Sequence, residues 1–154
     1  MNKKLILLNP PYTDEIYDFK QEFSVEYPLG LAYLAGTLQS NAVRNFDIID
    51  SNALCHTKEQ CVEYVTSYDV DILAITAVTN TIIIAAFIAE QCKLKLPNLT
   101  IVIGGPHTTA LPIETLEEFP CFDYAIQGDG ELPLLELYRT LNDNKKIEND
   151  RLRW

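Results

Sequence analysis

The sequence lacks any apolar run long enough to cross a membrane. A membrane-spanning helix needs about 18 or more consecutive apolar residues, and every apolar run in this chain is much shorter. The run near the N-terminus ends at Asn9-Pro10-Pro11, which is too early for a secretory signal. We therefore expect a cytoplasmic protein that has no membrane as a partner.

Basic residues are scarce. Lysine and arginine together number 12 against 22 acidic residues, and the formal net charge is −10. A chain of this charge is repelled at long range by nucleic acids and by anionic membranes. We therefore expect no nucleic-acid partner.

Histidine and cysteine are also rare, with two and four copies. The cysteines (Cys55, Cys61, Cys92 and Cys121) are spaced too widely for a metal-binding signature. In a cytoplasmic protein they should be reduced thiols. No Ser-His-Asp arrangement and no paired-carboxylate site is evident. The sequence thus predicts no protein metal site and no catalytic residue in this chain.

What the chain does contain is a regular alternation of short apolar segments with longer amphipathic or apolar ones. The short segments predict strands at 4–8, 46–50, 71–76, 100–103 and 123–126. The longer segments predict helices at 31–39, 58–67, 80–95, 112–119 and 131–141. Five strands alternating with five helices are typical of an α/β fold, a parallel doubly wound sheet with helices on both faces. We expect right-handed connections and the Rossmann-like, flavodoxin-type strand order 2-1-3-4-5.

Local signals support these assignments and set the domain limits. Thr57 and Gln60 form a capping-box pattern at the start of the second helix. The run Ile82-Ile83-Ile84 has strand propensity, but the length of the surrounding apolar segment favours a buried helix. We assign residues 1–141 to one domain. The charged residues 142–154 are expected to be a linker or a truncated tail.

The predicted topology brings four loops to the carboxyl edge of the sheet, where ligands bind in doubly wound folds. They are rich in glycine, proline and threonine and nearly free of charge, and they lie at 9–13, 76–81, 104–109 and 127–131. No phosphate-binding P-loop motif is present. The sequence Gly128-Asp129-Gly130 follows the last strand and has Pro133 where a dinucleotide turn needs its third glycine. A phosphoacceptor receiver domain would need acidic residues where this chain has Asn9. A large, mostly apolar ligand with polar edges suits these loops better than a triphosphate.

Four segments occur in register on this predicted fold: 7–12 (LLNPPY), 27–35 (YPLGLAYLA), 103–109 (IGGPHTT) and 123–131 (DYAIQGDGE). Together they resemble the cobalamin (vitamin B12)-binding N-terminal domain of radical S-adenosylmethionine proteins. That group includes the anaerobic magnesium-protoporphyrin IX monomethyl ester cyclase-type enzymes. The resemblance covers roughly residues 4–141 and implies cobalamin as the cofactor.

The resemblance assigns the cofactor-binding residues to the four loops. They are Pro10, Pro11, Tyr12, Thr76, Ala77, Val78, Thr79, Gly104, Gly105, Pro106, His107, Thr108, Gly128 and Gly130. Each group has a structural alternative. The glycines Gly104 and Gly105 either admit a ligand close to the backbone or simply make a tight turn. Thr79 either donates to the ligand or caps the next helix. The two prolines either line the site or end the first strand.

Histidine decides how the cobalt would be ligated. Many cobalamin-binding domains carry D-x-H-x-x-G after the first strand, and this chain has no histidine there. Its two histidines are His56 and His107. The resemblance places His107 in the loop for the nucleotide tail, so we expect it to form hydrogen bonds or to be structural. Cobalamin should then bind with no protein histidine on cobalt.

The resemblance also implies a larger enzyme. Its other domain, a C-terminal radical S-adenosylmethionine domain, would bind a [4Fe–4S] cluster through C-x-x-x-C-x-x-C and cleave S-adenosylmethionine. Methyl transfer, cyclisation or related radical chemistry would occur there. The alternatives are a stand-alone non-catalytic cobalamin carrier or sensor, a flavodoxin-like flavin or nucleotide domain, and a scaffold that binds nothing.

Overall fold

The computed structural model describes residues 2–12 and 27–143, and it contains one five-stranded sheet in which every neighbouring pair is parallel. The strand order is β2-β1-β3-β4-β5, as the sequence predicted. The strands are β1 (Leu5–Asn9), β2 (Phe46–Asp50), β3 (Ile72–Thr76), β4 (Thr100–Gly104) and β5 (Tyr124–Ala125). Leu5 to Leu8 of β1 are completely buried, because β1 lies inside the sheet and helices cover both of its faces.

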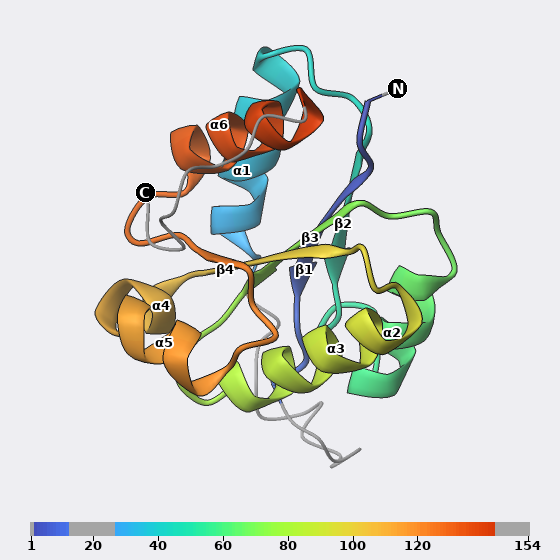
Figure 1. The fold of residues 1–154 in the computed structure, drawn as a ribbon, viewed down its shortest axis with the longest axis vertical. Helices are drawn as coiled ribbons and strands as arrows, with labels where there is room; N and C mark the ends of the chain where they lie inside the picture. The colour runs from blue at the N-terminus through green and yellow to red at the C-terminus, as the bar shows by residue number, and fades with distance from the viewer. Residues whose placement is uncertain (1, 13–26, 144–154) are drawn as a thin grey trace.

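Helices lie on both sides of the sheet (Figure 1). One face carries α1 and α6, whose side chains share a core with Leu5, Leu7 and Val102. The other face carries α2, α3 and α5, packed on Ile6, Leu8 and neighbouring strand residues. The helices are α1 (Leu29–Ser40), α2 (Lys58–Thr66), α3 (Ile82–Lys95), α4 (Pro106–Ala110), α5 (Pro112–Glu118) and α6 (Glu131–Asn142). No described helix is long and apolar enough to cross a membrane.

The boundaries agree with the sequence expectation to within about two residues, with one omission. The Thr57 hydroxyl accepts from the Gln60 N–H and the Gln60 side chain accepts from the Thr57 N–H, so the capping box is confirmed. Ile82-Ile83-Ile84 begin α3, as expected. The five-residue helix α4 was not predicted, since a single turn after two glycines gives no apolar periodicity. Residues 144–154 of the expected tail lie outside the described residues.

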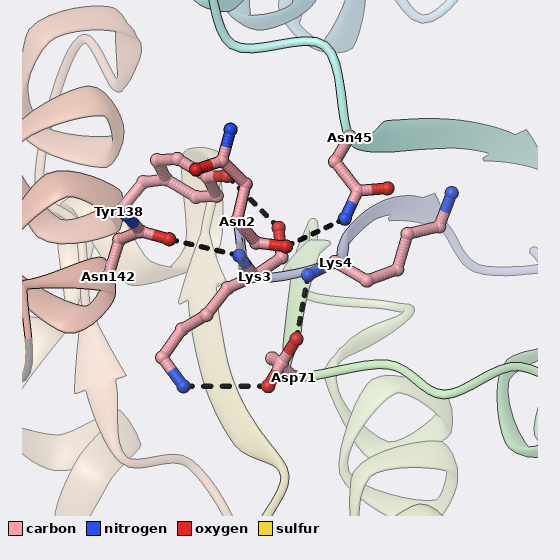
Figure 2. A network of polar contacts seen from close by, with 7 residues as sticks. All are labelled: Asn2, Lys3, Lys4, Asn45, Asp71, Tyr138 and Asn142. Carbon is pink, nitrogen blue, oxygen red and sulfur yellow. Dashed lines mark hydrogen bonds and ion pairs between the residues drawn. The ribbon is translucent and has the colours of Figure 1, made fainter.

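Polar contacts at the amino edge of the sheet hold α6 and β1 together (Figure 2). The Asp71 carboxylate accepts from the Lys4 N–H at 2.7 Å and faces the Lys3 ammonium at 3.4 Å. The Tyr138 hydroxyl donates to the Lys3 carbonyl at 3.0 Å, and the Asn142 side chain accepts from the Lys3 N–H at 3.0 Å. These contacts position α6 over the sheet, and α6 is one wall of the groove described below.

The cysteines give a direct test of this packing. Cys61, Cys92 and Cys121 are buried, whereas Cys55 is exposed. Burial raises the pKa of Cys92 to about 12 and that of Cys121 to about 11, and it also raises the pKa of Cys61. Because the thiolate is the reactive form, we expect a disulfide reagent at pH 8 to label Cys55 rapidly and the others only after denaturation. Rapid labelling of a second thiol in the native protein would contradict this packing.

Candidate functional site

A groove of about 180 Å³ opens at the carboxyl edge of the sheet, on the face covered by α1 and α6. Strands β3 and β4 form its floor, and the two helices form its walls. Five of the six glycines of the chain line it. The lining residues are Gly30, Leu31, Leu34, Ala74, Ile75, Thr76, Val102, Gly104, Gly105, Ile126, Gly128, Asp129, Gly130, Glu131 and Leu134.

The surface that lines the groove is mostly apolar. Ala74 and Val102 come from the sheet, and Leu31, Leu34 and Leu134 come from the helices. Asp129 lies in the loop before α6 and Glu131 is the first residue of α6. No lysine or arginine among the described residues lines the groove. A neutral, flat group would lose water here against the apolar side chains of the floor and walls.

At Gly105, the loop after β4 lies in close contact with the end of β3 and the loop that follows it. Its φ of 99° lies in the left-handed region. A Cβ at this position would lie 2.6 Å from the Thr76 hydroxyl oxygen and 2.8 Å from the Ala77 carbonyl oxygen. The close approach is held by hydrogen bonds from the Ala77 N–H to the Gly104 carbonyl at 2.9 Å and from the His107 N–H to the Ala77 carbonyl at 3.1 Å. Only glycine fits here.

Gly128 and Gly130 shape the opposite rim. Gly128 has a φ of 79° and no atom within 4 Å of an added Cβ, so its backbone faces open space. Its N–H donates to the Thr109 hydroxyl at 3.0 Å. A Cβ on Gly130 would lie 3.2 Å from a terminal carbon of Leu34, so the loop before α6 packs closely on α1. These glycines bring main chain, not side chains, to the mouth of the groove.

A second, more polar hollow of about 150 Å³ adjoins the groove at the end of β1. It shares Gly30, Leu31 and Thr76 with the groove, so the two hollows are adjacent. Its other lining residues are Asn9, Tyr12, Tyr27 and Pro28. Together the two hollows form a site with an apolar arm under α1 and α6 and a polar arm beside the loop after β1.

The structure brings some of the predicted site residues to these hollows. Thr76, Gly104, Gly105, Gly128 and Gly130 line the groove, and Tyr12 lines the second hollow with Thr76. The others line neither: Pro10, Pro11, Ala77, Val78, Thr79, Pro106, His107 and Thr108.

The residues outside the hollows have different surroundings. Pro10, Pro11, Ala77 and Thr108 are buried, and the Thr108 hydroxyl has no hydrogen-bond partner among the described residues. The His107 Nδ1 atom lies 3.2 Å from the Thr79 hydroxyl. No group of three or more His, Cys, Asp or Glu side chains able to hold a metal occurs within residues 2–12 and 27–143.

Sequence reasoning missed the helix-borne walls. Leu31, Leu34 and Leu134 were not predicted as site residues, and neither was the small residue Ala74 on the floor. Leu31 and Leu34 are three residues apart and therefore lie on one helical face. The available signal for a space beside the sheet was an alanine at the centre of a strand whose other residues are all larger.

These features define a ligand-binding doubly wound domain whose site lies at the carboxyl ends of its strands. The sequence profile of the B12 binding domain family matches residues 23–138. The chain belongs to this family.

Relatives of the chain carry names that agree with the family. An uncharacterized methyltransferase, PH0819, of Pyrococcus horikoshii is 33% identical over 145 residues, which are 94% of this chain and 31% of that protein. An anaerobic magnesium-protoporphyrin IX monomethyl ester cyclase of Cereibacter sphaeroides is 30% identical, over 80% of this chain and 20% of the cyclase. The cobalamin-dependent radical SAM methyltransferase TokK of Streptomyces tokunonensis is 36% identical over 53 residues, covering 34% of this chain and 8% of TokK. The chain spans less than a third of the length of each of these relatives.

Proposed function

We propose that the two hollows together hold cobalamin, with its nucleotide tail in the apolar groove and its corrin ring over the carboxyl ends of β1 and β3. The observation that supports this most is the groove itself: a mostly apolar surface bordered by five glycines in a B12 binding domain. The planar base of the tail would be buried between Ala74 and Val102 on one side and Leu31 and Leu134 on the other.

The proposal gives each loop a role. Gly104 and Gly105 bring the backbone close to the tail, and Gly128 and Gly130 do the same at the opposite rim. The Thr76 hydroxyl lies where the two hollows meet and can donate to an amide or phosphate oxygen of the ligand.

The predicted site residues that line neither hollow are assigned to the surroundings of the corrin ring and to the edge of the site. The loop after β3, with Ala77, Val78 and Thr79, lies beneath the corrin beside Pro10, Pro11 and Tyr12. Pro106 and Thr108 support the loop that carries the glycines, and the His107 ring is held by Thr79. When bound, cobalamin would supply a cobalt centre able to carry a methyl group, and the protein would position it.

We further propose that this domain serves a larger radical enzyme. The name of TokK, and the much greater length of both TokK and the cyclase, support a following radical S-adenosylmethionine domain, which would hold a [4Fe–4S] cluster. Residues 142–154 would then connect the two domains. Four free cysteines suit the cytoplasm, where we place the protein. A stand-alone cobalamin carrier would use the same groove. The arrangement of domains in the whole protein distinguishes such a carrier from a domain of a radical enzyme.

An anaerobic titration with hydroxocobalamin and methylcobalamin tests the binding proposal. We expect the corrinoid to co-elute with the chain on gel filtration, with a visible spectrum that lacks nitrogen ligation. The spectrum and the retained amount should be unchanged in His107→Ala, because His107 lines neither hollow. Nitrogen ligation that disappears in the variant would contradict the histidine-free site. Absence of retained corrinoid, or retention of flavin instead, would contradict the proposed cofactor.

A further inference from the structure

The Asn52 side chain, in the loop after β2, forms hydrogen bonds to the loop after β1. Asn52 lines neither hollow. The parallel ladder between these strands runs through the pair Asn9 and Asp50, and its last main-chain bond is from the Ser51 N–H to the Asn9 carbonyl at 3.0 Å. In a parallel ladder the next bond would come from the N–H of residue 11 to the Ser51 carbonyl. Residue 11 is proline and has no N–H, so the ladder ends. The Ser51 carbonyl accepts from the His56 N–H instead, at 2.9 Å.

Asn52 replaces the missing main-chain bonds with its side-chain amide. Its Nδ2 donates to the Pro10 carbonyl at 3.0 Å, and its Oδ1 accepts from the Tyr12 N–H at 3.0 Å. One planar amide thus pairs with the main chain on both sides of Pro11, as a peptide group of a neighbouring strand would. Because neither proline has an N–H, the three-residue segment from Pro10 to Tyr12 has one N–H to donate, and Asn52 accepts it.

The Asp50 carboxylate holds Asn52 in place through its main chain. The Asn52 main-chain N–H donates to the Asp50 carboxylate at 3.3 Å, and the same carboxylate oxygen accepts from the Asn9 side chain at 3.0 Å. Asn52 is half-buried, so its two bonds to the loop are partly shielded from water. The side chain therefore has little freedom to leave the loop it contacts.

We propose that Asn52 is a positioning residue for the corrin site: it fixes the Pro10-Pro11-Tyr12 loop as a rigid cover below the ring. The inference rests on the proposed function, since it assigns the loop to the lower face of cobalamin. Asn9 and Tyr12, on the two sides of the prolines, both line the polar hollow that adjoins the groove. With the amide in place, the cover excludes external ligands from the lower face of cobalt.

Three variants test this assignment. Asn52→Ala removes both bonds, and Asn52→Asp keeps an acceptor for the Tyr12 N–H but loses the donor to Pro10. Asn45→Ala is the matched control: its side chain also donates to a main-chain carbonyl, that of Asn2 at 2.9 Å, but at the opposite edge of the sheet (Figure 2).

Two measurements test separately the hydrogen bonds of Asn52 and its proposed role below the corrin ring. In the chain without cofactor, amide hydrogen exchange at Tyr12 should be about tenfold faster in Asn52→Ala, the change expected from losing a hydrogen bond. In the chain loaded with hydroxocobalamin, cyanide should form the bis-cyano corrinoid, which is ligated on both faces, about tenfold faster in Asn52→Ala. Asn52→Asp should fall between this variant and the wild type, and Asn45→Ala should match the wild type in both measurements.

Each result supports or overturns either the hydrogen-bonded clamp or its role below the corrin. Faster exchange and faster bis-cyano formation in Asn52→Ala support the assignment. Unchanged exchange at Tyr12 overturns the hydrogen-bonded clamp. Faster exchange with unchanged cyanide kinetics overturns its role below the corrin. If the wild type retains no corrinoid, the proposed function fails and the corrin role fails with it, while the cofactor-free exchange measurement still reports separately on the clamp.

Discussion

Replacing Gly105 by alanine is expected to lower the free energy of unfolding by about 3 kcal/mol, the largest loss expected for alanine at any of the six glycines. Two penalties add at this residue. A residue with a Cβ is strained at a φ of 99°, and the new carbon would be 2.6 Å from the Thr76 hydroxyl oxygen and 2.8 Å from the Ala77 carbonyl. The carbonyl is main chain fixed by the His107 N–H, so it has no room to move aside. Urea denaturation followed by circular dichroism measures the loss.

Alanine variants of two other glycines distinguish the cost of the positive φ from the cost of the short Cβ contacts. Gly128 also has positive φ, at 79°, but an added Cβ meets nothing within 4 Å, so Gly128→Ala should cost only about 1 kcal/mol. Gly36 lies in α1 without positive φ and with open space around its Cβ, so Gly36→Ala should stabilise the chain by about 0.5–1 kcal/mol. Equal losses for Gly105→Ala and Gly128→Ala would contradict the close contact between the loops after β3 and β4.

Much of the fold could be predicted because its signals are local. A run such as Leu5 to Leu8, apolar at every position, is what a strand covered on both faces requires. Thr57 and Gln60 satisfy the helix end by themselves, so the start of α2 could be read from four residues. The helix α4 escaped prediction because its five residues are held by tertiary hydrogen bonds, such as that from the His107 N–H to the Ala77 carbonyl, which no local pattern records.

The site was predicted less completely than the fold because it is defined by which atoms face a shared space. Loop membership predicted Gly104 and Gly105 at the carboxyl edge of the sheet, and both line the groove, since the carboxyl ends of parallel strands meet at one edge. The same reasoning included Thr108, which faces the interior and is fully buried. It also omitted Leu34 and Leu134, because the packing of α1 against α6 decides which side chains form the wall. Asn52 was missed for a similar reason: its role depends on a proline in another loop.

The groove itself can be tested by filling it while the fold is kept. Gly104 is the last residue of β4, has no positive φ, and lines the groove. A Cβ added there has its nearest neighbours, two atoms of Ile126, at 3.9 Å, which is ordinary contact distance. Valine also suits a strand. Gly104→Val should therefore fold, yet its side chain would occupy space that the nucleotide tail needs. Losing burial of the tail should weaken hydroxocobalamin binding by about 100-fold.

The control for this variant is Gly36→Val, which adds the same side chain to the exposed side of α1, away from the groove. It should bind hydroxocobalamin as the wild type does, with helix stability equal to or slightly above that of the wild type, because valine has a higher helix propensity than glycine. Equilibrium titration by visible absorbance gives the affinities, and urea denaturation shows whether both variants are folded. A folded Gly104→Val that binds cobalamin with wild-type affinity would place the nucleotide tail outside this groove. The five glycines would then serve the turns and helix packing of the domain alone.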